Sequence, residues 1–562
     1  VRLLTTDGDD LRPWRANAQL RSVLPSPPVW SPDGSRVLAL QADVSQLPEH
    51  PMLDWTAVPP RVLGRRLPTE GAAGVERGRL AVLDVAEARR VWLDLPDHRH
   101  HLPLRWLADG TAVLLLSLDA AAGELALVRA DPATGESLTL AQDTVVSVYA
   151  VLAAALSAAM TRLPDEHQAL WASDRDGDLR LYLVAPDETR PITPPGVQVD
   201  RVLGALPGGA VLLQAQSATA RPYDVQVCRT DGSGDFHVLT PEPGVHELAG
   251  LQADGSWLDR HSSLLGAPRV HVRALPDGEV LQTSVQPDDL ARGHREGFTT
   301  VAADGRTELH GVLFLPTGAG PHPVVDVIYG GPHVIAHPRA RDEGGAHLWD
   351  SRGLIAELLA VLGFAAVVLD ARGTPGRGRA FQQHAADDVG VLTAADHAGS
   401  LRQLASRHAA LDLSRCGVLG TSFGAYHAVR CGLLHPDLFR AVVAHAGPYD
   451  LEQVMPGWFA PMLGTSFCDN PEAYRRAGIV AYAAELQPEL LLVHGTHDVN
   501  VPLCHTMRLS HELNEAGKRH ELLLLQGQSH HLRGAAAELA LKNAACFLAD
   551  HLSPQHETGR QQ

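Results

Sequence analysis

A serine stands between two glycines at residues 420–424, in the pattern Gly-x-Ser-x-Gly. An apolar run precedes the pattern and a helix-forming run follows it. In that context Ser422 sits on a sharp turn from a strand into a helix, where its hydroxyl is exposed and can act as a nucleophile. The pattern alone more often marks a surface turn, so Ser422 is a candidate only if its chemical partners follow it in the chain.

A serine hydroxyl needs a base within hydrogen-bond reach, and that base needs an acid to hold it. The apolar run 490–493 ends in a loop that carries Asp498, and the apolar run 522–525 ends in a loop that carries His530. The chain order serine, acid, histidine is that of an α/β-hydrolase. The sequence therefore predicts a catalytic triad of Ser422, His530 and Asp498.

Two residues compete for these roles. Asp450 follows an earlier predicted strand and is a rival acid, but the position after the later strand favours Asp498. His531 is adjacent to His530, and side chains of neighbouring residues point in different directions, so only one of them can act as the base. We assign that role to His530.

Other histidines and the cysteines are expected to be structural. His494 and His497 are expected to support the acid loop. The cluster of His98, His100 and His101 lacks carboxylate or thiolate partners, so we expect a solvated loop there and not a metal site. The six cysteines lack Cys-x-x-Cys spacing, which indicates reduced thiols. No metal or other cofactor is predicted.

The oxyanion formed on attack needs donors aimed at the place where charge develops. One is the backbone N–H of Phe423, the residue after the nucleophile. The second should come from the loop after an early strand, residues 328–332. Either the hydroxyl of Tyr329 or a glycine amide could supply it, and the chemistry alone leaves that choice open.

Residues 291–562 alternate between apolar runs of strand length and helical patterns. The runs 298–302 and 309–315 flank a turn, and later runs are 324–329, 365–370, 416–420, 441–445, 490–494 and 521–526. Uniformly apolar strands with helices between them indicate a doubly wound, mostly parallel sheet covered on both faces. We predict a C-terminal α/β-hydrolase domain with its chemistry at the carboxyl ends of the strands.

Residues 1–290 consist of short strand-like runs between turn signals. The signals include Trp-Ser-Pro-Asp-Gly at 30–34 and Asp-Gly at 109–110, 176–177 and 254–255. A sheet of this size cannot bury both of its faces alone, so stacking of several sheets into a β-propeller is the natural arrangement. A pair of β-sandwiches is the alternative.

Charge and hydropathy exclude some partners. The 562 residues carry a formal net charge of −18 and a pI near 5.9, which argues against nucleic acid or an anionic membrane as a partner. No run of apolar residues is long enough for a membrane span, and the first residues do not form a signal segment. A cytoplasmic location is the expectation.

Together these motifs resemble the prolyl oligopeptidase family of serine peptidases, and most closely its dipeptidyl peptidase IV branch, bacterial members included. The likeness covers the whole C-terminal half and is weaker in the first half. The segments that carry it are 326–332, 369–378, 420–424, 494–501 and 527–530, with 30–34 and 48–51 in the first half.

The resemblance implies cleavage of short peptides after a small or apolar residue such as Pro or Ala, in a cavity between propeller and hydrolase. It assigns the oxyanion hydroxyl to Tyr329 and a contact with a substrate carbonyl to Asn500. It places Phe423, Trp458 and Val501 around an apolar pocket, with core packing as the alternative role for Trp458. It also implies a homodimer formed through the hydrolase half.

The sequence departs from the branch in ways that leave the cleavage mode open. Members hold the substrate's amino group with an adjacent Glu pair, but residues 11–20 lack one and no Glu-Glu dipeptide occurs in the chain. Val454 stands where a pocket tyrosine is expected, and the propeller looks short, with fewer blades. The alternatives are an acylaminoacyl-releasing enzyme or esterase on the same triad, or a propeller-based binding protein with a vestigial hydrolase.

Overall fold

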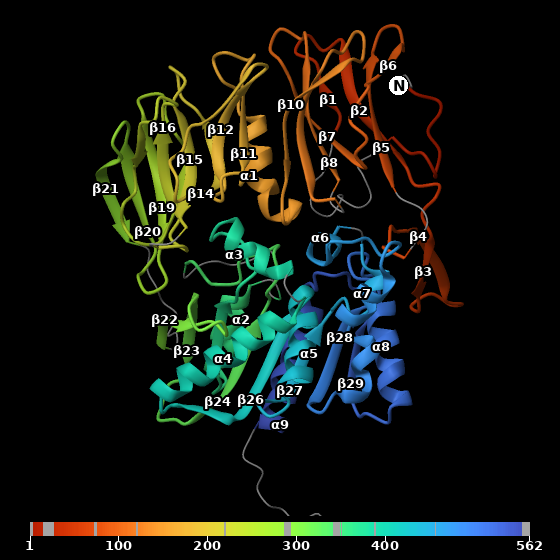
Figure 1. The fold of residues 1–562 in the computed structure, drawn as a ribbon, viewed down its shortest axis with the longest axis vertical. Coiled ribbons are helices and arrows are strands. Elements are labelled where there is room, and N and C mark those ends of the chain that lie inside the picture. The colour runs from red at the N-terminus through yellow and green to blue at the C-terminus, as the bar shows by residue number, and fades with distance from the viewer. Residues whose placement is uncertain are drawn as a thin grey trace, which may run out of the picture.

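The computed structural model has two parts, a fan of antiparallel sheets and a mixed α/β part below it (Figure 1). It describes residues 4–14, 27–71, 76–119, 122–218, 221–285, 294–340, 349, 351–386, 389–455 and 457–552.

The first part contains five successive antiparallel sheets among the described residues. The first has β1 (Val29–Trp30), β2 (Arg36–Asp43), β5 (Arg77–Asp84) and β6 (Arg90–Trp92). The second has β7 (His100–Trp106), β8 (Val113–Asp119), β9 (Glu124–Ala130) and β10 (Ser137–Thr144). The third has β11 (Ala169–Ser173), β12 (Arg180–Ala185) and β13 (Glu188–Pro191). The fourth has β14 (Val197–Ala205), β15 (Val211–Ser217), β16 (Gln226–Thr230) and β17 (Phe236–Val238). The fifth has β18 (Val245–Ala249), β19 (Ser256–Ser262), β20 (Arg269–Ala274) and β21 (Glu279–Val285).

Buried apolar side chains lie between neighbouring sheets and join them face to face. Leu38 of the first sheet shares a cluster with Trp106 and Leu115 of the second. Leu212 of the fourth sheet shares one with Trp257 of the fifth. Each sheet therefore buries its faces against its neighbours, which is the packing of propeller blades and confirms the predicted β-propeller.

A helix in the propeller was not predicted from the sequence. α1 (Val148–Met160) precedes the three-stranded third sheet and packs against β11 and β14. Its sequence is rich in alanine, the residue with the highest helix propensity, so the strand pattern expected for the first half is wrong here. The helix buries its apolar side chains between blades, and its N-terminal turn faces the hydrolase part (Figure 1).

The expectation of a solvated loop at the first histidine cluster is wrong as well. His100 and His101 begin β7, and His98 lies just before it; all three are buried. Ser117 Oγ contacts both His98 Nδ1, at 2.9 Å, and His101 Nδ1, at 3.0 Å. Burial lowers the pKa of His100 to about 3 and that of His101 to about 4, so these side chains are neutral parts of a blade core.

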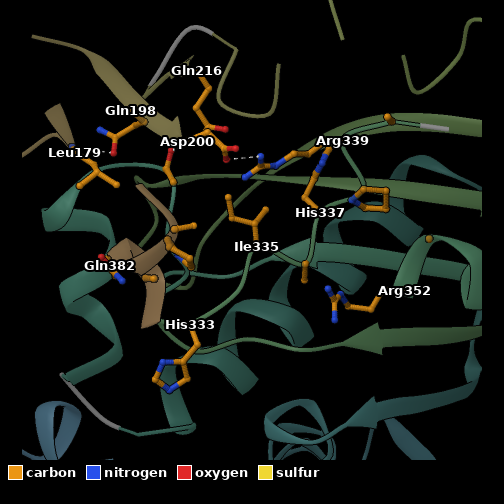
Figure 2. Close-up of a pocket in the computed structure, with 18 of the residues that line it drawn as sticks. Leu179, Gln198, Asp200, Gln216, His333, Ile335, His337, Arg339, Arg352 and Gln382 are labelled. Atoms are coloured by element: carbon orange, nitrogen blue, oxygen red, sulfur yellow. Dashed lines mark hydrogen bonds and ion pairs between the residues drawn. The ribbon is translucent and has the colours of Figure 1, made fainter. Parts of the chain in front are cut away.

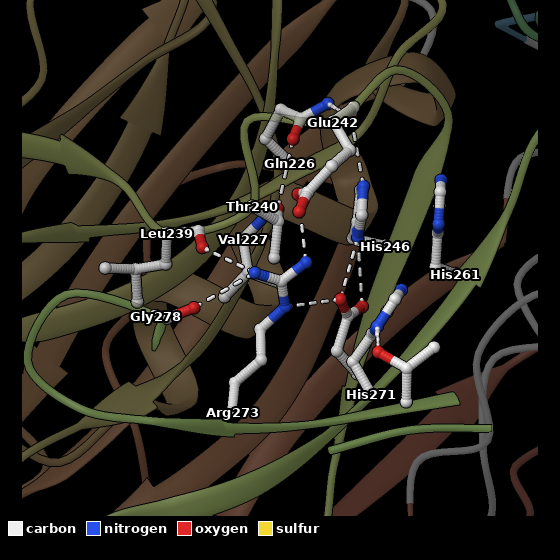
Figure 3. Close-up of polar contacts among 12 residues, drawn as sticks. Gln226, Val227, Leu239, Thr240, Glu242, His246, His261, His271, Arg273 and Gly278 are labelled. Atoms are coloured by element: carbon white, nitrogen blue, oxygen red, sulfur yellow. Dashed lines mark hydrogen bonds and ion pairs between the residues drawn. The ribbon is translucent and has the colours of Figure 1, made fainter. Parts of the chain in front are cut away.

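A polar cluster is buried in the fifth blade (Figure 3). Arg273, 1% exposed, donates from Nε to Asp259 at 2.7 Å and from a terminal nitrogen to Glu242 at 2.9 Å. Another terminal nitrogen donates to the carbonyl oxygen of Gly278 at 3.0 Å. The same Asp259 carboxylate lies 2.9 Å from His246 Nδ1. The cluster ties β18, β19 and β20 to the loop that enters the blade.

A hairpin arm leaves the propeller and reaches down beside the hydrolase part (Figure 1). It consists of β3 (Glu49–Asp54) and β4 (Arg61–Arg66), which form a two-stranded sheet of their own among the described strands. The carbonyl oxygen of Leu53 accepts a hydrogen bond from Gln526 at 3.3 Å. The arm thus connects the propeller to the end of the last strand of the second part.

The second part is built on one eight-stranded sheet, ordered β22-β23-β25-β24-β26-β27-β28-β29. The strands are β22 (His294–Val301), β23 (Glu308–Leu315), β24 (His322–Ile328), β25 (Ala365–Asp370), β26 (Leu411–Thr421), β27 (Phe439–His445), β28 (Glu489–Gly495) and β29 (Glu521–Leu525). β22 and β23 are antiparallel and the other strands run parallel to one another. This is the predicted α/β-hydrolase sheet.

Helices cover both faces of this sheet. α4 (Val391–Arg407), α5 (Phe423–Leu434) and α8 (Cys504–Glu515) share a core on one face, and α2 (Arg352–Val361) and α9 (Gly534–Leu552) share a core on the other. Shorter helices are α3 (Arg379–Gln383), α6 (Ala460–Leu463) and α7 (Pro471–Ala477). Along β24, Val324 faces the first core and Val325 the second, the alternation that a strand buried on both faces requires.

Two expectations concern the ends of these parts. The boundary predicted at residue 290 lies outside the described residues, between the end of β21 and the start of β22, and stays a prediction. Within the described ranges, no helix is long and apolar enough to cross a membrane.

Candidate active site

Ser422 lies on the turn between β26 and α5, in a conformation that few residues other than glycine adopt. Its φ is 58° and its ψ is −123°, and its backbone N–H donates to the carbonyl oxygen of His445 at 2.7 Å. A Cβ on Gly420 would lie 2.1 Å from the carbonyl oxygen of Gly424, and a Cβ on Gly424 would lie 2.4 Å from that of Ile328. Both glycines are needed for this close turn, and the strain holds the hydroxyl at the strand end.

Parallel pairing brings the ends of four strands to one edge. Thr421 at the end of β26 pairs with His445 of β27, and His445 pairs with Val493 of β28. Gly495 at the end of β28 pairs with Leu525 at the end of β29. The loops after these strands, which carry Ser422, Asp498 and His530, therefore open at the same carboxyl edge of the sheet.

Asp498 and His530 are in direct contact there. His530 Nδ1 lies 2.7 Å from Asp498 Oδ2, and both side chains are buried. The other oxygen, Asp498 Oδ1, accepts the backbone N–H groups of Asn500 at 2.8 Å and Val501 at 2.9 Å. Burial would raise the pKa of the Asp498 carboxyl, but the charge of His530 and hydrogen bonds from His494 and His530 outweigh it and lower that pKa.

The loop that carries Asp498 is held from several sides. His494 contacts Thr506 Oγ1 at 2.7 Å through Nδ1 and the carbonyl oxygen of Val501 at 2.9 Å through Nε2. The backbone N–H of His497 donates to the carbonyl oxygen of Gln528 at 2.9 Å, which joins the acid loop to the histidine loop. These contacts fix the distance between the loops that bear the carboxylate and the imidazole.

The rival residues have other partners. Asp450 forms an ion pair with Arg508 and accepts the N–H of Glu452, so its carboxylate caps the turn at 451–453. The ring of His531 lies edge-on to that of His530, with ring centroids 5.2 Å apart. The contact with Asp498 that a triad requires is made by His530.

The loop after β24 lies on the other side of the serine. Tyr329 follows β24 and is half-buried, and the guanidinium carbon of Arg352 lies 4.9 Å from the centre of its ring. A Cβ on Gly331 would lie 2.3 Å from the ring of Phe423, so the glycine lets the two loops approach. The N–H of Phe423 is the first in α5 and has no acceptor within that helix. Both predicted oxyanion donors therefore belong to loops next to Ser422.

Aromatic rings from both parts of the molecule meet beside this point. The half-buried ring of Trp458 lies 5.6 Å from that of Tyr149 and 5.2 Å from that of His333. Tyr149 belongs to α1 of the propeller, and Ser147 before it contacts His333 Nδ1 at 2.8 Å. The predicted pocket residue Trp458 thus has a neighbour in the propeller that the sequence did not indicate, because only the fold brings the unexpected α1 to this place.

The other predicted substrate residues lie nearby but differ in exposure. Asn500 is half-buried and Val501 is buried, both in the loop that holds Asp498. The ring of Phe423 is fully buried and packs against His333 and Phe459 as part of a core.

Glu70 is an acidic group of the propeller side that sequence reasoning missed. Its carboxylate accepts the N–H of Gly457 at 3.1 Å, and its own N–H donates to the carbonyl oxygen of Val454 at 2.9 Å. Burial raises the pKa of Glu70 to about 7, although the Gly457 N–H opposes the rise. Of the segment 11–20, in which the sequence lacks the adjacent Glu pair of the branch, residues 15–20 lie outside the described residues.

A cavity of about 800 Å³ lies between the propeller and the hydrolase part, next to these loops (Figure 2). It is lined by His333 and Arg352 from the hydrolase side and by Gln198 and Gln216 from the blades. Its volume is in the range of about 300–1,000 Å³ that is usual for small-molecule sites. In the part of the chain that the structure describes, no group of three or more metal-ligating side chains is arranged to hold an ion.

Two family profiles match the chain, one for each part. The profile of the prolyl oligopeptidase family matches residues 349–555. The profile of the dipeptidyl peptidase IV N-terminal region matches residues 26–242.

Individual proteins agree with these profiles. Dipeptidyl peptidase 8 of Homo sapiens is 32% identical over 246 residues, which are 42% of this chain and 26% of that protein. The crystal structure of Porphyromonas gingivalis dipeptidyl peptidase 4 has a TM-score of 0.85 at 20% identity, and the match covers 98% of this chain and 78% of that one. A putative dipeptidyl aminopeptidase IV from Bacteroides ovatus has a TM-score of 0.83 at 19% identity, with 98% and 80% covered. The matched segment thus spans about a quarter of the human relative, and the solved structures share the fold.

Proposed function

The chain belongs to the prolyl oligopeptidase family of serine peptidases, in its dipeptidyl peptidase IV branch, and from this premise we propose that it is itself a serine peptidase. Its substrates are short peptides cut after a small or apolar residue such as Pro or Ala. The observation that carries the proposal is the 2.7 Å contact between His530 Nδ1 and Asp498 Oδ2, at the sheet edge where the strained Ser422 lies.

The first half of the reaction forms an acyl-enzyme. Ser422 Oγ attacks the carbonyl carbon of the scissile bond while His530 Nε2 takes the hydroxyl proton. His530 donates its Nδ1–H to Asp498, which fixes the tautomer that leaves Nε2 basic and stabilises the imidazolium. The carbonyl oxygen becomes an oxyanion that accepts hydrogen bonds from Tyr329 and from the N–H of Phe423. The imidazolium then gives its proton to the leaving amine as the C–N bond breaks.

The second half releases the acyl group. A water molecule attacks the ester carbon, His530 takes one of its protons, and the same donors hold the second oxyanion. The proton returns to Ser422 as the ester bond breaks. Asp498 stays ionised throughout, since its N–H donors and its histidine partners favour the charged carboxylate.

Substrate selection is assigned to the residues around the serine. Trp458 and Val501 form an apolar wall for the residue before the scissile bond, and Asn500 binds a substrate carbonyl. The blades above the cavity limit access, so folded proteins are excluded by size. Selection of Pro or Ala over larger side chains rests on the shape of this pocket and is measured as a ratio of kcat/KM values.

A second candidate is an acylaminoacyl-releasing enzyme or esterase that uses the same triad. It is favoured by one feature of the sequence, which has no adjacent pair of glutamates to hold a free amino group. A propeller-based binding protein with a vestigial hydrolase is the third candidate, and the short His530–Asp498 contact argues against it.

Three substrates and one variant separate these candidates. The kcat/KM values for Gly-Pro-anilide, N-blocked Ala-Pro-anilide and a p-nitrophenyl ester rank the peptidase and esterase activities. Cleavage of Gly-Pro-anilide above the blocked substrate supports the peptidase with a free amino end, and the reverse order supports the acylaminoacyl alternative. Ser422→Ala should abolish all three rates; unchanged rates in this variant would refute the assignment of the nucleophile.

Two further expectations remain proposals: a homodimer formed through the hydrolase half and a cytoplasmic location. Sedimentation of the purified chain measures the first, and fractionation of the source cells measures the second.

A further inference from the structure

The cavity between the two parts has walls rich in charge. Five arginines and three carboxylates line it, within a chain whose formal net charge is −18. Its two histidines, His333 and His337, add no charge at neutral pH, because burial lowers their pKa values to about 4 and about 3. The described lining therefore carries an excess of positive charge in an otherwise acidic protein.

Most of these arginines have a carboxylate of their own. Four pairs account for them: Arg339 with Asp200 at 3.1 Å, Arg379 with Asp174 at 2.9 Å, Arg295 with Glu357 at 2.7 Å, and Arg201 with Glu247, outside the cavity, at 3.9 Å. The Arg339–Asp200 pair is drawn in Figure 2.

Arg352 differs from these four. It forms no ion pair with any described residue, and its Nε is buried without a described hydrogen-bond partner. It is the first residue of α2, and its guanidinium points toward the middle of the cavity (Figure 2). The buried Asp370 carboxylate acts on Arg352 only from beyond ion-pair distance, so the hydration that the half-buried guanidinium has lost is only partly replaced. An anionic group that enters the cavity would replace it with a charge-assisted, two-point contact.

The position of Arg352 would place a bound anion close to the scissile carbonyl. Its guanidinium carbon lies 4.9 Å from the ring of Tyr329, the proposed oxyanion donor. An extended peptide spans ~3.5 Å per residue. A group bound to Arg352 is thus within about two residues of the scissile carbonyl.

We propose that Arg352 is a specificity residue that binds a carboxylate of the peptide substrate one or two residues from the scissile bond. The C-terminal carboxylate of a tripeptide or tetrapeptide and the side chain of an acidic residue have the required chemistry. This inference rests on the proposed peptidase function, because it uses the position of Tyr329 beside the reacting carbonyl. The proposed function selects for the residue before the scissile bond, and this inference adds selection for a carboxylate on the peptide.

Three matched tripeptides test the proposal. Ala-Pro-Ala has a free C-terminal carboxylate, Ala-Pro-Ala-amide has none, and Ala-Pro-Asp-amide carries the carboxylate on a side chain. We expect kcat/KM for at least one of the two carboxylate peptides to exceed that for Ala-Pro-Ala-amide by about tenfold. Arg352→Gln should remove the difference between the carboxylate peptides and Ala-Pro-Ala-amide, and Arg352→Lys should keep part of it, because an ammonium makes a single-point contact.

Arg201→Gln is the matched control. It removes one positive charge from the same cavity at a position on β14 and leaves Arg352 in place. The preference for a carboxylate should survive in this variant. Its loss in Arg201→Gln to the same extent as in Arg352→Gln would mean that the general field of the cavity holds the anion, and the assignment to Arg352 would be wrong. Thermal unfolding checks that each variant is folded.

The peptide with the higher kcat/KM identifies the source of the carboxylate. A preference for Ala-Pro-Ala assigns the site to the chain terminus, and a preference for Ala-Pro-Asp-amide assigns it to a side chain. Equal kcat/KM values for all three substrates overturn the proposal. A uniform loss of rate for all three in Arg352→Gln also overturns it, because the arginine would then act only through Tyr329.

A binding measurement separates this proposal from the proposed function. In the Ser422→Ala variant, calorimetric titration should show tighter binding of a carboxylate peptide than of Ala-Pro-Ala-amide, and Arg352→Gln in that background should remove the difference. Absence of any cleavage by the unmodified protein would refute the peptidase function and leave this binding result standing. Cleavage without a binding preference would refute the role of Arg352 alone.

Discussion

A histidine and an aspartate meet in the fifth blade of the propeller and again at the carboxyl edge of the hydrolase sheet. In the blade, His246 Nδ1 lies 2.9 Å from Asp259 Oδ2; at the edge, His530 Nδ1 lies 2.7 Å from Asp498 Oδ2. Both aspartates are buried, and their partners outweigh burial and lower the pKa of both carboxyls. The contact itself is nearly the same in the two places.

The surroundings of the two pairs differ. In the blade, Arg273 balances the charge of Asp259, and His246 Nε2 is occupied by the carbonyl oxygen of Glu242 at 3.0 Å. At the sheet edge no arginine of the described residues forms an ion pair with Asp498, and backbone N–H groups donate to its second oxygen. In the blade the Asp259 carboxylate is thus shared between Arg273 and His246, whereas the side-chain partners of the Asp498 carboxylate are His530 and His494. We therefore predict that the pair at the sheet edge supports catalysis and that the pair in the blade supports stability alone.

The two histidine–aspartate pairs should differ most in how an Asp→Asn substitution changes kcat, and the larger change is expected for Asp498→Asn. We expect kcat to fall on the order of 10,000-fold, because the amide favours the wrong histidine tautomer and cannot stabilise the imidazolium. Steady-state cleavage of a Pro- or Ala-containing anilide measures this. The same substitution in the blade, Asp259→Asn, should leave kcat within about threefold, as that carboxylate touches no part of the site.

For the free energy of unfolding we expect the reverse order, with the larger loss in Asp259→Asn than in Asp498→Asn. Asp259→Asn removes the fully buried one of the two carboxylates that pair with Arg273, and breaking such a buried ion pair costs about 3–5 kcal/mol of unfolding free energy. Denaturant titration of the purified variant measures the loss. A blade that kept its full stability would show that the Asp259 cluster is not what holds β18, β19 and β20 to the entering loop.

A third buried carboxylate, Glu70, extends the comparison because it forms no ion pair with a cation of the described residues. Its pKa is raised to about 7, so between the ordinary glutamate pKa and pH 7 the folded protein binds more protons than the unfolded one. Stability is therefore lost as the pH rises through 7. Glu70→Gln should remove this loss and should gain stability relative to the unmodified protein between pH 5 and pH 8.

Denaturant titrations at pH 5 and pH 8 test this sign. The expected trend is opposite to that of Asp259 and Asp498. Their lowered pKa values give stability that is present above the ordinary aspartate pKa and lost as the pH falls toward the folded-state value. An unchanged pH dependence in Glu70→Gln would contradict the account of Glu70.

The smallest effect is expected at the contact between the two parts. Tyr149→Ala removes the propeller ring that packs on Trp458 and should raise KM about threefold to tenfold while kcat changes little, since Tyr149 touches no reacting atom. Steady-state kinetics of Tyr149→Phe, which keeps the ring, provide the control. A fall in kcat with constant KM would place Tyr149 closer to the chemistry than its position in α1 indicates.

The hydrolase half was predictable from the sequence because its signals are local. Each apolar strand, the glycines around Ser422 and the chain order of Ser422, Asp498 and His530 can be read within a few residues. The predicted strands at 324–329, 365–370, 416–420, 441–445, 490–494 and 521–526 correspond to β24 through β29. The roles of the site residues stay predictions until activity is measured.

The features that were missed depend on contacts distant in sequence. Glu70 meets Gly457, and Tyr149 meets Trp458, across the junction of the two parts. His100 looked like a loop residue because its burial comes from neighbouring blade strands. The alanine-rich helix α1 was missed because its residues were assigned to the pattern of short strands that surrounds them.

One measurement tests the central claim that Asp498 and His530 activate Ser422. The rate of modification by a fluorophosphonate is followed for the unmodified protein, Asp498→Asn and Asp259→Asn, and the labelled residue is identified by mass spectrometry. The account predicts labelling at Ser422 that slows by at least about 100-fold in Asp498→Asn and is unchanged in Asp259→Asn. Equal labelling rates in the first two proteins, or a label on a different residue, would contradict it.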